Sequence, residues 1–116
     1  MGIICCYDFQ VGLAAMQYSI IDQGPEVVVG LDGQVNYACS GEFKTLMGEL
    51  AAYKGRRIVF DLERIHHIDS VGLGFLYVAK EELSLPDHPL GLKAPQEAVR
   101  RLLELTESYA DFDIRA

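Results

Sequence analysis

The stretch from Ile58 to Glu82 constrains the fold more than any other part of this 116-residue chain. It opens with a short run of β-branched, aromatic and aliphatic side chains, Ile58, Val59, Phe60 and Leu62, which is typical of a strand buried on both faces. A turn follows, and the segment Asp69-Ser70-Val71-Gly72-Leu73-Gly74 then begins a helix that continues through Ala79. A buried strand that leads into a helix indicates an α/β arrangement.

Ser70 is predicted to be the N-cap of this helix, with its hydroxyl accepting a hydrogen bond from a free backbone N–H. The N-terminus of a helix carries partial positive charge, and Gly72 and Gly74 would let another molecule approach the backbone. The position therefore suits a phosphate, either bound or covalently attached to Ser70. A plain helix cap with no regulatory role is the alternative interpretation of this serine.

The other segments alternate between strand and helix patterns. Residues 17–21 and 26–31 are predicted to form an antiparallel hairpin, and residues 32–36 a turn that leads into a first helix. A third helix is predicted to begin at Pro95, and a last edge strand to include residues 112–114. The pattern predicts one α/β domain over residues 16–116, with a mixed β-sheet and about three main helices. Residues 1–15 are an N-terminal extension.

The composition excludes several classes of protein. A net charge of −7 without a basic stripe argues against nucleic-acid binding. No stretch approaches the roughly 18 consecutive apolar residues of a membrane span, so no membrane insertion is expected. The three cysteines, Cys5, Cys6 and Cys39, do not form a disulfide framework and predict reduced thiols in a cytoplasmic protein.

No residue pattern predicts an enzyme. A metal site could be considered at His66, His67 and Asp69. Adjacent residues in a turn point apart, however, and no further ligand has suitable spacing. Ser70 has no G-x-S-x-G context, and no Lys-Ser or Lys-Thr pair follows Gly74. We therefore predict no catalytic residue, no metal site and no cofactor.

The helix after Asp69 is apolar nearly all round, which is more than a single core-facing stripe requires. The additional apolar side chains either contact a neighbouring helix or form an exposed patch for a partner.

Three segments resemble one known family. These are Asp69 to Gly74 after a strand ending in Asp61-Leu62, the early turn Leu31 to Asn36, and the late helix Val99 to Thr106. Over residues 17–114 the chain resembles the STAS domain (sulfate transporter and anti-sigma antagonist), in particular the free-standing bacterial anti-sigma factor antagonists. The chain departs from the family pattern at Val71, where a second hydroxyl residue is common, and at Asn36, where an acid is common.

The resemblance implies a binding module that acts by partner switching. Ser70 would be phosphorylated by a protein that is both anti-sigma factor and serine kinase, and phosphorylation would release that partner; a phosphatase is a second expected partner. The residues assigned to partner binding are Asn36, Asp69, Ser70, Val71, Gly72, Leu73 and Gly74. The alternative is a structural or regulatory subunit of a transport or stress-signalling complex that is not phosphorylated.

Overall fold

The computed structural model describes residues 16–53 and 55–115. The predicted extension, residues 1–15, lies outside this range. The strands are β1 (Met16–Asp22), β2 (Glu26–Val35), β3 (Arg57–Ile68), β4 (Gly91–Lys93) and β5 (Asp113–Arg115). The helices are α1 (Ser40–Leu50), α2 (Ser70–Leu83) and α3 (Glu97–Leu105), with short 3-10 turns η1 (Tyr37–Cys39), η2 (Ala51–Tyr53) and η3 (Tyr109–Asp111). The α/β class and the three helices are confirmed.

The five strands form one mixed sheet in the order β1-β2-β3-β4-β5. β1 pairs with β2 antiparallel, and the other neighbouring pairs are parallel. The predicted hairpin is confirmed: the Gln23 N–H donates to the Glu26 carbonyl oxygen at 2.9 Å, and Gly24 adopts the left-handed conformation with φ +86°. Each parallel connection from β2 onward contains one helix.

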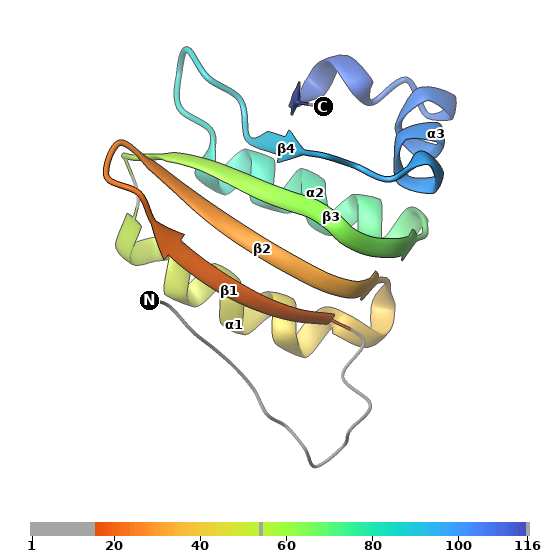
Figure 1. The fold of residues 1–116 in the computed structure, drawn as a ribbon, viewed down its shortest axis with the longest axis horizontal. Coiled ribbons are helices and arrows are strands. Elements are labelled where there is room, and N and C mark those ends of the chain that lie inside the picture. The colour runs from red at the N-terminus through yellow and green to blue at the C-terminus, as the bar shows by residue number, and fades with distance from the viewer. Residues whose placement is uncertain (1–15, 54, 116) are drawn as a thin grey trace.

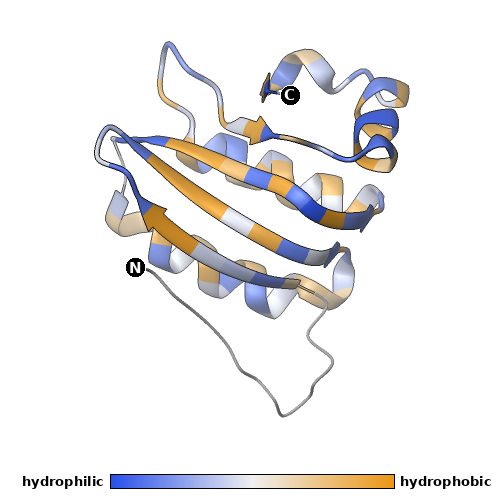
Figure 2. Ribbon diagram, in the orientation of Figure 1, coloured by the Kyte–Doolittle hydropathy of each residue, from blue (hydrophilic) through white to orange (hydrophobic). Residues whose placement is uncertain are grey.

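The helices cover one face of the sheet. Parallel strands that follow one another in the same direction across a sheet need right-handed crossovers, which place their helices on the same side. Figure 1 shows α1 behind β1 and β2, and α2 next to it behind β3. Apolar residues run along β2 and β3 with polar interruptions (Figure 2), because alternate side chains point to the helices and to the open face. The largest fully buried side chains include Phe60, Met16, Leu46, Leu50, Ile58, Leu62, Ile65, Leu76, Leu90, Leu92 and Leu103.

β2 and β3 are both longer than predicted. The turn expected after Leu62 is wrong, because β3 continues to Ile68 and pairs with β2 as far as Val35. The pairing shifts twice, between Gly30 and Asp32 and between Gly33 and Gln34, and β3 contains one extra residue at each shift. Such β-bulges let Leu62, Ile65 and Ile68 all be buried although they are three residues apart. The strict two-residue alternation expected of a strand is therefore absent from this part of the sequence.

α3 also begins later than predicted, at Glu97 instead of Pro95. Gln96 is the N-cap residue and has extended backbone angles, φ −70° and ψ 165°. Ala94, before the proline, has φ +53°, and its N–H donates to the Arg115 carbonyl oxygen at 2.7 Å. Residues 94–96 thus form the connection from β4 to α3 and also contact β5.

Candidate functional site

The predicted site lies at the carboxyl edge of the parallel strands. Val35 and Ile68 are register partners at the ends of β2 and β3, so the residues that follow them, Asn36 and Asp69, come to the same edge of the sheet. The Asp69 N–H donates to the Val35 carbonyl oxygen at 3.4 Å. The structure therefore brings together the two parts of the predicted site that are far apart in sequence.

Asn36 shapes the turn between β2 and α1. Its side-chain oxygen accepts a hydrogen bond from the Ala38 N–H at 2.9 Å, and its side-chain NH₂ donates to Gln34 Oε1 at 3.0 Å. Both ends of the amide are thus bound within the chain. This arrangement leaves the next residue, Tyr37, 74% exposed beside the site.

Asp69, and not Ser70, is the N-cap of α2. Asp69 has extended backbone angles, and its Oδ1 accepts a hydrogen bond from the Gly72 N–H at 2.8 Å. Ser70 is the first residue of the helix and is exposed. The prediction of a Ser70 cap is wrong because aspartate and serine both cap helices well, and the helix here begins one residue later than assumed. The Ser70 hydroxyl is consequently not needed for the cap.

Gly72 and Gly74 have different surroundings. A Cβ on Gly72 would lie 1.9 Å from the Val35 carbonyl oxygen, so the start of α2 packs directly against the end of β2. A Cβ on Gly74 would meet nothing within 4 Å, and Gly74 is exposed. The fold itself therefore requires the glycine at position 72, whereas nothing within the described residues explains the glycine at position 74.

Some of the additional apolar side chains of α2 pack against neighbouring elements and others are exposed, so both predicted roles occur. Phe75 stacks on Phe43 of α1 with ring centroids 5.0 Å apart, and Tyr77 packs against Phe112 at 5.3 Å. Val71 and Val78 remain 46% and 50% exposed. Since positions 71, 74 and 78 lie on the same side of a helix, they form an exposed stripe that begins next to Ser70.

A shallow groove continues this stripe between α1 and α2. It has a volume of about 300 Å³ and is lined by Met47, Ala51, Val78, Glu82 and Leu83. The sequence did not point to Met47, Ala51 or Tyr37 as part of a site. The only available signal was the all-round apolar character of α2, which indicated an additional contact surface without locating it.

The electrostatics of the site favour an anion at the N-terminus of α2 but not at the buried thiol of Cys39. The backbone N–H groups at the start of α2 carry partial positive charge near Ser70, while the Asp69 carboxylate already occupies the cap. Cys39 is fully buried, and burial, together with the nearby acids Glu42 and Asp69, raises the pKa of its thiol. A buried thiol with a raised pKa is a packing residue with little nucleophilic character.

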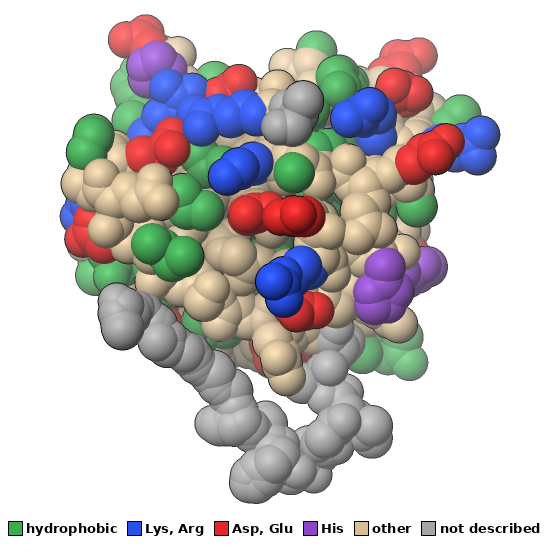
Figure 3. Space-filling view, in the orientation of Figure 1, with side chains coloured by type: hydrophobic (Ala, Val, Ile, Leu, Met, Phe, Trp, Pro, Cys, Tyr) green, Lys and Arg blue, Asp and Glu red, His purple; other side chains and the backbone are tan. Residues whose placement is uncertain are grey.

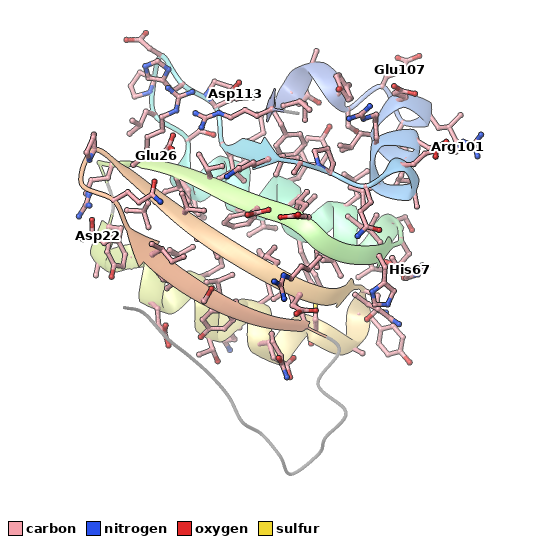
Figure 4. The ribbon with its side chains drawn as sticks, viewed as in Figure 1. Asp22, Glu26, His67, Arg101, Glu107 and Asp113 are labelled. Carbon is pink, nitrogen blue, oxygen red and sulfur yellow. The ribbon has the colours of Figure 1, made fainter. Side chains whose placement is uncertain are left out.

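His66 and His67 lie in β3, not in a turn as predicted, and both are exposed. Figure 4 shows His67 at the edge of the sheet where β3 ends. Over residues 16–53 and 55–115, no three or more His, Cys, Asp or Glu side chains are grouped so that they could hold a metal ion. Within the same residues, none of the helices combines the length and the apolar character needed to span a membrane.

Comparison with known proteins gives a family match over nearly the whole chain. The STAS domain family matches residues 17–116. Among solved structures, an anti-sigma factor antagonist from Mycobacterium paratuberculosis is 23% identical with a TM-score of 0.77, over 89% of this chain and 87% of that one. The unphosphorylated form of the anti-sigma factor antagonist SpoIIAA is 18% identical with a TM-score of 0.64, over 85% and 87%. The protein TM1081 is 22% identical with a TM-score of 0.63, over 98% and 89%. With its mixed sheet and its Asp69-Ser70 helix start, the chain belongs to the STAS domain family.

Proposed function

We propose that this protein is an anti-sigma factor antagonist that acts by partner switching in the cytoplasm. Unphosphorylated, it binds an anti-sigma factor that is also a serine kinase; phosphorylated on Ser70, it releases that partner. A phosphatase restores the binding form. The chain acts as a binding module and not as an enzyme.

The observation that carries the proposal is the position of Ser70. It is an exposed residue at the start of α2, is not used as the helix cap, and adjoins the apolar stripe of Val71, Gly74 and Val78. A kinase can therefore reach the hydroxyl without unfolding the helix. The anti-sigma factor antagonists among the similar structures, one of them described as the unphosphorylated form of SpoIIAA, support the same role.

The switch would be electrostatic. A phosphate adds about −1.5 to −2 charges at pH 7, and the N-terminus of α2 tolerates an anion in the free protein. A docked partner must instead remove water from that dianion next to the Asp69 carboxylate, which costs several kcal/mol unless cations are supplied. A loss of about 2.7 kcal/mol is enough to weaken binding a hundredfold.

The test compares Ser70→Ala with Ser70→Asp. Proteins that copurify with the wild type from its own cells are identified first, and affinity for the purified partner is then measured by calorimetry. We expect Ser70→Ala to bind like the wild type, and Ser70→Asp to bind at least tenfold more weakly while remaining folded.

Ser40→Asp is the matched control, because Ser40 is likewise an exposed first residue of a helix, α1. It should retain most of the affinity. An equal loss in Ser40→Asp and Ser70→Asp would mean that net charge, not the Ser70 site, controls binding. Equal affinity of the two Ser70 variants, with no phosphate found on Ser70 in cells, would refute the switch and favour the unphosphorylated structural subunit.

A further inference from the structure

The two edges of the sheet differ in how they are protected. β5 is three residues long, and its charged residues form ion pairs: Arg115 with Glu26 at 2.9 Å, and Asp113 with Arg57. Figure 4 shows Asp113 at β5 and Glu26 at the start of β2, so the Arg115–Glu26 pair reaches across the sheet, and Figure 3 shows mixed charges on the open face of the sheet. Short, charged edge strands resist pairing with other chains.

β1 is less protected, because its one charged residue is Asp22 at its last position, which forms an ion pair with Arg56. It is seven residues long, contains no Lys, Arg or Pro, and pairs with β2 without a bulge. No strand among the described residues pairs with its outer edge. Long, regular and largely uncharged edges are templates for the addition of a further strand.

The hairpin identifies which backbone groups point outward. Gln23 is hydrogen-bonded to Glu26, and in an antiparallel pair the bonded positions alternate along the strand. Positions 21, 19 and 17 therefore use their N–H and C=O groups toward β2. The same groups of Met16, Tyr18, Ile20 and Asp22 point to the free edge.

This pattern is self-complementary. If two copies of β1 run antiparallel about an axis through Ser19, Met16 faces Asp22 of the second copy and Tyr18 faces Ile20. Each of these is a hydrogen-bonded pair, and all seven residues are used. An aromatic side chain opposite a β-branched one is a favourable pair, and no two like charges lie opposite each other.

We propose that β1 is the interface of a symmetric dimer, in which two sheets join into one through this register. β1 lies two strands away from β3, which leads to Ser70, so the dimer does not depend on the proposed partner switch. A single pair of strands buries less surface than a permanent interface, so the dimer is weak and depends on concentration. Glu49, which accepts a hydrogen bond from Tyr18 at 3.1 Å, brings like charges near the interface, so added salt strengthens it.

The test uses the position on the two-fold axis. Sedimentation velocity of the full chain over a concentration series should show a monomer–dimer equilibrium. Ser19→Lys and Ser19→Asp each place two like charges opposite each other, so each variant alone should dimerise at least tenfold more weakly. An equimolar mixture of the two should recover dimers, because Lys then faces Asp. Gly30 is the register partner of Ser19, and a hollow of about 400 Å³ beside both leaves room for the longer side chains in the monomer.

Ala98→Lys and Ala98→Asp are the controls, because Ala98 is exposed on α3, which packs against β3 and not β1, and these changes alter net charge equally. The dimerisation constants of these control variants should be closer to that of the wild type than those of the Ser19 variants are. Circular dichroism should show all four variants folded. If the wild type is monomeric up to about 1 mM, the proposal is refuted. This conclusion is the same whether residues 1–15 or a different protein covers the edge of β1. A dimer that both Ser19 variants leave intact, or that their mixture fails to restore, also refutes it.

Discussion

Replacing Gly72 and Gly74 by alanine makes the same chemical change two residues apart in α2, with opposite expected effects on stability. At position 74 the new methyl group meets no atom within 4 Å. Alanine then gains only what it gains in any helix, about 0.5–1 kcal/mol over glycine. Gly74→Ala should therefore raise the free energy of unfolding by that amount.

At position 72 the methyl group would lie 1.9 Å from the Val35 carbonyl oxygen, 2.7 Å from its carbon and 3.0 Å from Ile68 Cγ1. Two of these three atoms belong to the backbone of β2, which cannot rotate away as a side chain can. The start of α2 must move, which weakens both the Asp69-to-Val35 hydrogen bond and the cap on Gly72. Overpacking of this kind costs about 1–3 kcal/mol, more than the helix gain.

Urea denaturation of both variants measures the difference directly. With unchanged slopes, the midpoint of Gly74→Ala should lie above that of the wild type and that of Gly72→Ala below it. Because both variants share the helix gain, their free energies of unfolding should differ by the overpacking cost, about 1–3 kcal/mol. Gly48→Ala, at an exposed glycine in α1 with equally free space, should match Gly74→Ala. If Gly72→Ala were as stable as Gly74→Ala, the close packing of α2 on β2 would be wrong. If the proposed partner docks on this stripe, Gly74→Ala should also bind it more weakly, whereas Gly48→Ala should not.

Two further predictions concern the helix cap and the strand β1. Asp69→Ala should lower stability by about 0.5–2 kcal/mol in thermal melts, whereas Ser70→Ala should leave it nearly unchanged. A larger loss of stability in Ser70→Ala than in Asp69→Ala would show that Ser70 is the cap. Burial and the hydrogen bond to Glu49 raise the pKa of Tyr18 from 10.0 to about 12. Since the folded state holds this proton more tightly, its contribution is complete below pH 10 and is lost as the pH rises through 12. Tyr18→Phe should flatten the loss of stability in that window, and an unchanged pH profile would contradict the assignment.

The sequence alone determined the features that depend on neighbouring residues. The turn before Glu26 and the apolar pattern after it predict the hairpin, because turn composition and strand character are local signals. The alternation of strand and helix patterns predicts the α/β class for a similar reason. The Asp69 to Gly74 segment located the start of α2, and with it the candidate site.

Local sequence signals could not determine whether Asp69 or Ser70 is the N-cap of α2. Both side chains can accept the same kind of hydrogen bond, and the selection depends on where β3 stops pairing with β2. That end point is set by two bulges, which bury Leu62 and Ile68 through contacts with residues about thirty positions away. A sequence pattern read over a few residues cannot contain this information.

Only the tertiary structure distinguished Gly72 from Gly74 and identified β1 as an edge strand. The sequence gives Gly72 and Gly74 the same helix cost, but the carbonyl group that distinguishes them belongs to Val35, on a different strand. The outer edge of β1 is likewise defined by strand order, because a strand is an edge only when the rest of the sheet lies on its other side. Such properties arise from packing between distant segments, and the local sequence does not specify them.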